Sequence, residues 1–219
     1  MTKLIVVGAG GHAAEINDYI GHGERKSGIG QFNIQGFIDD NPDSYSRYSL
    51  SGPFLGTIAD HAIRADCKYL LAIGSPDSRR RIVERFLSLG ASFASLIHAD
   101  AHISDSAHCG VGVVIAPNAN IGPNVEVGSF TLVNARASIG HDSIVGRFNN
   151  LCPNVCLSGF TVVGDDNLFG INCATIPGIR VGNRNKFAAG MVISSDIEDD
   201  NVVFYRYKER VLVIPKERR

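Results

Sequence analysis

Residues 103–193 repeat a pattern of six residues, and this repeat limits the possible folds more than any other feature of the sequence. The first residue of each hexad is apolar with one exception, and the second is almost always small. The residues at the first position are Ile103, Cys109, Ile115, Ile121, Val127, Val133, Ile139, Val145, Leu151, Leu157, Val163, Phe169, Thr175, Val181, Phe187 and Ile193. A period of six is neither the 2.0 of a strand nor the 3.6 of a helix, so the repeating unit has to be a strand followed by a corner.

Three such units close one triangular coil of 18 residues, with the large apolar side chain inside and the small residues at the corners. Residues 103–192 hold 15 uninterrupted hexads. They predict five coils of a parallel β-solenoid, in which each coil rests only on its neighbours.

The chain before the repeat alternates between expected strands and helices. The expected strands are residues 4–7, 36–38, 69–73 and 93–97. The expected helices are residues 12–20, 58–63 and 78–89, the last with Asp77 as its N-cap. This order predicts a small parallel sheet with helices on its faces.

Composition excludes several classes of protein. The 21 basic and 22 acidic side chains leave a net charge of −1, which argues against nucleic acid as a partner. The apolar runs are too short to cross a membrane and the N-terminus has no signal-peptide core, so we expect a cytoplasmic protein without membrane contact. Five cysteines without a C-x-x-C pair indicate free, buried thiols rather than disulfides or a zinc site.

A glycine turn follows the first expected strand. Residues 8–13 match the pattern G-x-G-x-x-A between a strand and a helix, a context in which backbone N–H groups bind phosphate. Asp39 and Asp40 close the second strand, where a carboxylate can accept hydrogen bonds from a ribose or a base edge. Residues 1–98 are too short for a complete dinucleotide-binding fold, so a nucleotide attached to a sugar fits better than NAD.

Further motifs follow in a fixed order along the chain. They are Val7-Gly8-Ala9-Gly10-Gly11-His12, Phe37-Ile38-Asp39-Asp40-Asn41, Ala72-Ile73-Gly74, Leu96-Ile97-His98, Ile139-Gly140-His141-Asp142 and Ala174-Thr175-Ile176-Pro177-Gly178. With these motifs and its hexads the chain resembles, from residue 4 to about residue 195, the bacterial N-acetyltransferases of nucleotide-linked 4-amino sugars and the related sialic acid O-acetyltransferases.

The resemblance implies an α/β Rossmann-like parallel sheet followed by a left-handed parallel β-helix. Residues 1–98 would bind the nucleotide sugar, residues 99–195 would form the acetyltransferase domain, and residues 196–219 would be a C-terminal β extension. Residues 201–215 lack the Gly-x-Pro-Ala-Lys end common in relatives and look like an added hairpin or strand pair. The substrate-binding residues implied are Gly10, Gly11, His12, Asp39, Asp40 and Gly74.

His141 is the candidate general base. Without the resemblance, an exposed histidine on a solenoid is most simply a surface residue, although imidazole has the chemistry of a base near neutral pH. The family places its catalytic base at this point of the motif. Asp142 is a candidate to orient it, but neighbouring residues on a strand point to opposite faces, which leaves that role open.

The resemblance also implies a site for acetyl-CoA between two subunits of a homotrimer. The matching positions are Asn150, Gly159, Ile171 and Ala189. Some relatives have a histidine where this chain has Asn150, so that contact is altered here. His98, His102 and His108 lie near the domain junction without the spacing of a metal site, and no metal is expected.

The expected function is acetyl transfer from acetyl-CoA to the amine of a nucleotide-linked 4-amino sugar, for bacterial surface glycan synthesis. His141 would act as the base, and no covalent intermediate would form. The alternatives are an O-acetyltransferase of sialic acid or another free sugar, a non-catalytic protein that binds a nucleotide sugar, and a nicotinamide-dependent oxidoreductase. A solenoid that carries His141 argues against the oxidoreductase. The glycine turn with Asp39 and Asp40 favours a nucleotide-linked sugar over a free sugar as the acceptor.

Overall fold

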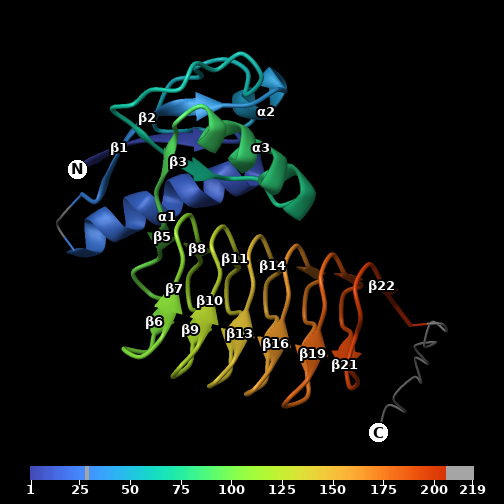
Figure 1. The fold of residues 1–219 in the computed structure, drawn as a ribbon. Coiled ribbons are helices and arrows are strands. Elements are labelled where there is room, and N and C mark those ends of the chain that lie inside the picture. The colour runs from blue at the N-terminus through green and yellow to red at the C-terminus, as the bar shows by residue number, and fades with distance from the viewer. Residues whose placement is uncertain (28–29, 206–219) are drawn as a thin grey trace, which may run out of the picture.

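A computed structural model describes residues 1–27 and 30–205 of the chain. A layered α/β domain lies over one side of a long solenoid, and the chain leaves the solenoid at its far end (Figure 1). The fold class expected from the sequence, a parallel sheet followed by a left-handed β-helix, is confirmed. No helix in the described part of the chain is long and apolar enough to cross a membrane.

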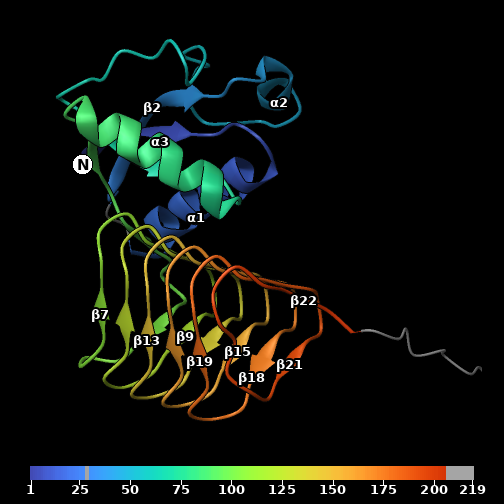
Figure 2. The same cartoon turned by 45° about the vertical axis from the view of Figure 1, so that its right-hand side comes forward.

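The α/β domain contains one parallel sheet with the strand order β2-β1-β3-β4. Its strands are β1 (Thr2–Val7), β2 (Phe32–Ile38), β3 (Lys68–Leu71) and β4 (Ser92–Phe93). Its helices are α1 (Gly11–Ser27), α2 (Pro42–Ser46) and α3 (Pro76–Ser88). Leu4 and Val6 of β1 pack with α1, whereas Ile5 and Val7 pack with α3. The two long helices therefore cover opposite faces of the sheet (Figure 2).

Several local expectations for this domain are wrong. The expected helix 58–63 is absent: residues 58–60 form a turn, in which the Ala59 N–H donates to Asp40 and the Asp60 N–H donates to Thr57, and residues 61–63 have no regular structure. The N-cap of α3 is Ser75, whose hydroxyl accepts the N–H of Ser78 at 3.3 Å, and not Asp77.

The expected strand 93–97 is in fact two strands that belong to different sheets. β4 pairs with β3, whereas β5 (Leu96–Ile97) pairs with β8 of the solenoid. Helix α1 is also longer than expected, and residues 42–46 form the short helix α2 where the sequence indicated a turn. The sequence pattern thus predicts which elements this domain contains better than it predicts their first and last residues.

The solenoid consists of 18 strands of two residues each, in three parallel sheets. The first sheet contains β7 (His108–Cys109), β10 (Glu126–Val127), β13 (Ile144–Val145), β16 (Val162–Val163) and β19 (Arg180–Val181). The second contains β5, β8 (Val114–Ile115), β11 (Leu132–Val133), β14 (Asn150–Leu151), β17 (Leu168–Phe169), β20 (Lys186–Phe187) and β22 (Val202–Val203). The third contains β6 (His102–Ile103), β9 (Asn120–Ile121), β12 (Ser138–Ile139), β15 (Cys156–Leu157), β18 (Ala174–Thr175) and β21 (Val192–Ile193).

These strands make six coils, one more than the hexads predict, because the solenoid extends beyond the repeat at both ends. It begins with β5, before residue 99, and includes β22, beyond residue 195. The last coil is two residues short, since Lys186 pairs with Val202 rather than with residue 204. Up to residue 205 the expected hairpin is therefore absent and the chain continues the solenoid; residues 206–219 lie outside the described part.

The first residues of the hexads form an apolar interior, as the sequence predicts. Thr175, the polar exception, is buried, and its hydroxyl accepts the N–H of Ser158 at 2.9 Å and lies 3.0 Å from the Thr161 hydroxyl. A buried hydroxyl with partners costs little, whereas one without them destabilises a fold. Hydrogen bonding thus explains why a polar side chain is tolerated at the first position of a hexad, where the other residues are apolar.

A residue with positive φ recurs every six residues at the corners of the coils. Most of these residues are glycine, asparagine or aspartate, which tolerate the left-handed conformation best. The residue before each of them is proline at Pro117, Pro123, Pro153 and Pro177. Proline is tolerated there because no backbone carbonyl in the described coils accepts the N–H at this position; where the residue is Arg147, Asp165 or Asn183, the N–H donates only to a side chain of the next coil.

Helix α3 and the corners of the solenoid form one contact between the two parts. Arg79 is completely buried and donates to the carbonyls of Ile73, at 3.0 Å, and of Phe130. Burial lowers the pKa of Arg79 to about 10. Arg80 pairs with Asp166, with a shortest distance of 2.6 Å, and lies over the ring of Phe148.

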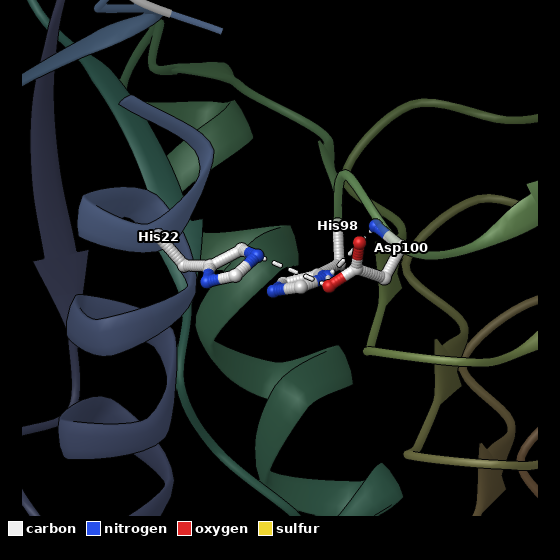
Figure 3. Close-up of side chains that lie close together, drawn as sticks. All are labelled: His22, His98 and Asp100. Carbon is white, nitrogen blue, oxygen red and sulfur yellow. Dashed lines mark hydrogen bonds and ion pairs between the residues drawn. The ribbon is translucent and has the colours of Figure 1, made fainter. Parts of the chain in front are cut away.

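A second contact joins α1 to the first coil. His22 Nε2 lies 3.0 Å from Asp100 Oδ2, and the rings of His22 and His98 stack with centroids 4.9 Å apart (Figure 3). The potential ligand atoms of these three residues lie within 4.8 Å of one another, as in a metal site. However, Lys26 pairs with the same carboxylate, and the Asp100 N–H donates to His98 Nδ1 at 3.0 Å. We interpret the cluster as a contact between domains.

The burial of His98 predicts a pH-dependent stability. Burial lowers the pKa of His98, an effect that Asp100 partly opposes, so the unfolded chain binds the proton more tightly than the folded protein. The stabilisation is complete above the unfolded pKa of about 6.5 and is lost as the pH falls through the lower folded pKa. In urea unfolding, the wild type should lose more stability between pH 7.5 and 5.5 than His98→Gln. His102→Gln, at an exposed histidine, is the control, and an equal loss in all three proteins would contradict this account.

Candidate active site

The glycine turn lies where β1 and β3 end side by side, at the point where the strand order of the sheet reverses. Open α/β sheets bind ligands at such a point. Gly8 has a φ of +109°, and a Cβ there would lie 2.7 Å from the carbonyl oxygen of Ala72, so only glycine fits. The Ala9 N–H donates to Asp39 Oδ2 at 2.7 Å. Asp39 therefore holds the turn in place.

Gly10 and His12 leave this turn open for a ligand. A Cβ on Gly10 would meet nothing within 4 Å, whereas one on Gly11 would lie 3.2 Å from the hydroxyl of Tyr48. His12 Nδ1 lies 3.1 Å from a carboxylate oxygen of Glu15. Its Nε2 is buried and has no hydrogen-bond partner among the described residues. Tyr48 is a neighbour of the turn that sequence reasoning missed.

A hollow of about 420 Å³ opens beside Asp39 and Asp40. Its other lining residues come from the loop between α2 and β3, the segment just after β3 and helix α3, namely Ile58, Ile73, Ser78, Arg81, Ile82 and Arg85. Sequence reasoning missed Ser78 and Arg81, although they follow a strand at a helix N-terminus just as the glycine turn does. The hollow is thus lined by apolar side chains, by carboxylates and by guanidinium groups.

Gly74 and Asn150, expected in different sites, are in direct contact. Asn150 is buried, and its side chain donates to the Gly74 carbonyl at 2.7 Å. Its oxygen accepts a hydrogen bond from Asn134 at 3.0 Å. The pair ties the end of β3 to β14, so the carboxyl end of β3 lies against the solenoid. Asn134 is a further residue that the sequence reasoning did not single out.

His141 lies at the corner between β12 and β13, with a side chain that is 57% exposed. Its ring meets the ring of Phe160 edge-on, with centroids 5.1 Å apart. A Cβ on Gly159 would lie 2.8 Å from His141 Nε2, so the imidazole lies against a glycine that leaves room for it. The register of 18 residues per coil places position 159 next to position 141.

Asp142 contacts the imidazole of His141, although successive side chains on a strand are expected to point to opposite faces. Its Oδ2 lies 2.8 Å from His141 Nδ1, and its other oxygen accepts a hydrogen bond from Asn124 at 2.9 Å. Alternation fails because Asp142 is a corner residue with a φ of +57°. The hydrogen bonds from Asn124 and then from His141 lower the pKa of the Asp142 carboxyl, which therefore stays ionised.

Ile171 and Ala189 lie together at a different corner of the solenoid, between the second and third sheets. The Gly190 N–H donates to the Ile171 carbonyl at 2.8 Å, and the Ile171 side chain is exposed. One chain thus brings Gly159 to His141 but does not bring Ile171 and Ala189 to the same corner.

The cysteines offer no alternative nucleophile. All five are free, and burial raises the pKa of the thiols of Cys67, Cys109, Cys152 and Cys173. A raised pKa keeps a thiol protonated and unreactive. Cys156 is exposed, on the strand that leads to Gly159, and no hydrogen bond or ion pair in the described structure joins it to His141.

Comparison with known proteins supports this description. Residues 3–86 match the family model of the PglD N-terminal domain. We refer to residues 3–86 as the PglD-type domain, after the family model that they match. The acetyltransferase domain of PglB from Neisseria gonorrhoeae superposes on the chain with a TM-score of 0.78 and 29% identity, over 91% of this chain and 94% of that one. PerB from Caulobacter crescentus gives a TM-score of 0.78 at 24% identity, over 92% and 93% of the two chains. The expected resemblance to the hexapeptide-repeat sugar acetyltransferases is confirmed.

Curated relatives match only part of their own length. The bifunctional protein GlmU of Clostridium perfringens is 25% identical over 138 residues, which cover 55% of this chain and 30% of that protein. The chain thus spans about a third of the curated relatives it matches. The PglD-type domain and the solenoid together align with the solved acetyltransferases, whereas these relatives share roughly half of the chain.

Proposed function

We propose that the chain transfers the acetyl group of acetyl-CoA to the amine of a nucleotide-linked amino sugar. The observation that carries this proposal is the exposed His141 imidazole, with an ionised carboxylate on Nδ1 and a glycine corner beside Nε2. The gonococcal PglB domain has been solved with acetyl-CoA, and PerB with CoA and GDP-perosamine. These ligands give the classes of donor and acceptor that we propose for this chain.

In the proposed mechanism the acceptor amine attacks the thioester carbonyl while His141 Nε2 takes its proton. Asp142 accepts a hydrogen bond from Nδ1 and stabilises the imidazolium that forms. The imidazolium can then return the proton to the departing CoA thiolate. The acetyl group passes directly between donor and acceptor, so the reaction needs neither a covalent enzyme intermediate nor a metal.

Gly159 is the proposed donor to the oxyanion. Its N–H occupies the corner position at which other coils have proline, and it has no hydrogen-bond partner among the described residues. A free N–H beside the base can stabilise the negative charge that develops on the thioester oxygen. The free N–H and the imidazole at this corner would thus act on the same reacting group.

The PglD-type domain would hold the nucleotide. We propose that Gly10, Gly11 and His12 lie along the pyrophosphate and sugar, close to the N–H groups that begin α1. Asp39 secures the turn, and Asp40, in the adjoining hollow, would accept hydrogen bonds from the nucleoside. The contact between Gly74 and Asn150 directs this domain toward the solenoid.

The coenzyme site would form between chains of a homotrimer. His141 and Gly159 belong to one corner, whereas Ile171 and Ala189 belong to another, so a single chain does not line one coenzyme from all four positions. A neighbouring chain that presents its own Ile171 and Ala189 opposite His141 would complete the site. Asn150, whose amide is already bonded to Gly74 and Asn134, would then act through this contact rather than on the thioester.

Sedimentation velocity tests the shared site. At micromolar concentration the protein should sediment with about three times the chain mass of 23.5 kDa. A stable monomer that is fully active would contradict a site built from two chains.

Gly10→Val tests the nucleotide site. The position has room for a side chain in the free protein, so folding should be unaffected, but the new side chain would occupy the space through which the phosphates approach. Calorimetry should show weaker binding of the nucleotide sugar and unchanged binding of acetyl-CoA. Unchanged affinity for the nucleotide sugar would remove the glycine turn from the site.

His141→Ala tests the base. Loss of a general base should lower kcat by roughly 10²- to 10⁴-fold, with little change in the binding of either substrate. The limb of the pH–rate profile that reports the base should disappear with it. His102→Ala, which removes an exposed histidine elsewhere on the solenoid, should keep wild-type kcat. If His141→Ala is fully active, the proton goes to another group and the proposed mechanism is wrong.

A further inference from the structure

We infer that Asn124, one coil before His141, is a positioning residue that acts on the base through Asp142. This inference rests on the proposed function, because it assigns a role within the same site. Asn124 lies 18 residues before Asp142, so the register of the coils places the two at the same corner, one above the other. Both have left-handed backbone conformations, with φ of +56° and +57°.

The hydrogen bonds form a chain from Asn124 to the imidazole. An ionised carboxylate can only accept, so the amide nitrogen of Asn124 donates to Asp142 Oδ1, at 2.9 Å. The second carboxylate oxygen lies 2.8 Å from His141 Nδ1. Both oxygens of Asp142 are therefore engaged, which restricts rotation of the carboxylate. Without Asn124 the contact with His141 alone would restrain the carboxylate.

The carboxylate also selects the tautomer of His141. Because Asp142 accepts, Nδ1 has to carry the proton, and this leaves Nε2 as the acceptor. Nε2 is the nitrogen beside Gly159, where the reacting group would lie. Asn124 thus helps to keep the lone pair of the base on the side of the imidazole where it is needed.

The backbone around this chain of bonds is held by neighbouring coils. The Asn124 N–H donates to the hydroxyl of Ser106 at 3.0 Å, and the Asp142 N–H donates to the carbonyl of Pro123 at 2.9 Å. Asn124 therefore projects its amide from a fixed point.

A similar bond elsewhere provides a matched control. The side chain of Asn183 also donates to a carboxylate of the following coil, 3.1 Å from each oxygen of Asp199, but at a different corner. Asp199 pairs with Arg184 rather than with a histidine. Both asparagines join neighbouring coils, but only Asn124 bonds a carboxylate that contacts a histidine. A comparison of the two therefore distinguishes an effect on the coil from an effect on the base.

The first test compares Asn124→Gly with Asn183→Gly. Glycine tolerates the left-handed conformation at position 124, so the first variant should fold. It should lower kcat by roughly ten- to a hundredfold, the scale expected when a catalytic group is misplaced, with KM unchanged. Asn183→Gly should keep wild-type kcat. Wild-type kcat in Asn124→Gly, or an equal loss in both variants, would overturn the inference.

A double-mutant cycle then tests whether Asn124 acts through Asp142. Asp142→Ala should lower kcat, and addition of Asn124→Gly should lower it no further, because coupled residues are not additive. Additive losses would show that Asn124 acts by another route and would contradict the inference.

Nitrogen-15 NMR of the imidazole makes the test independent of turnover. The wild type should hold His141 mainly as the Nδ1–H tautomer, and Asn124→Gly should increase the Nε2–H fraction, whereas Asn183→Gly should not. If no amino sugar is acetylated but the tautomer shifts as expected, the proposed function fails and the positioning role stands. If the tautomer is unchanged, the positioning role fails, whatever the substrate.

Discussion

The stacking register of the coils is the constraint on which the rest of the structure depends. Parallel pairing at a spacing of 18 residues places each corner directly on the corner of the preceding coil. His141 therefore lies beside Gly159, and Asp142 lies beside Asn124, without any long-range loop to position them. Because each coil rests on its neighbours, a functional group at a corner has a rigid backbone on both sides.

The contact between the two domains depends on the same register. α3 inserts the buried Arg79 against the Phe130 carbonyl, and Arg80 packs on Phe148, one coil further along the same corner. At the next face, Asn150 holds the Gly74 carbonyl. These contacts direct the ends of β1 and β3 toward the solenoid. A nucleotide held at the glycine turn would thus have its sugar carried toward the coils, as acetyl transfer between the two parts requires.

The solenoid, its apolar interior and the exposed corner of His141 could all be predicted from the hexads, because one repeat specifies every coil. The pairing of Asp142 with His141 could not, because it depends on the left-handed φ of Asp142. Once the register is known, the difference of 18 between Asn124 and Asp142 does indicate contact. In the α/β domain, Tyr48 over Gly11 and Asn134 beside Asn150 depend on tertiary packing and leave no local pattern.

The central claim is that the solenoid corner and the PglD-type domain serve one acetyl transfer to a nucleotide-linked amine. Mass spectrometry of the products from acetyl-CoA and a panel of UDP-, dTDP- and GDP-linked amino sugars, with free amino sugars and sialic acid alongside, tests it most directly. The account predicts that one nucleotide-linked amino sugar gains a single acetyl group in an amide that survives mild alkali, and that the free sugars gain none. An acetyl ester on a free sugar, or no product from any nucleotide-linked amine, would contradict it.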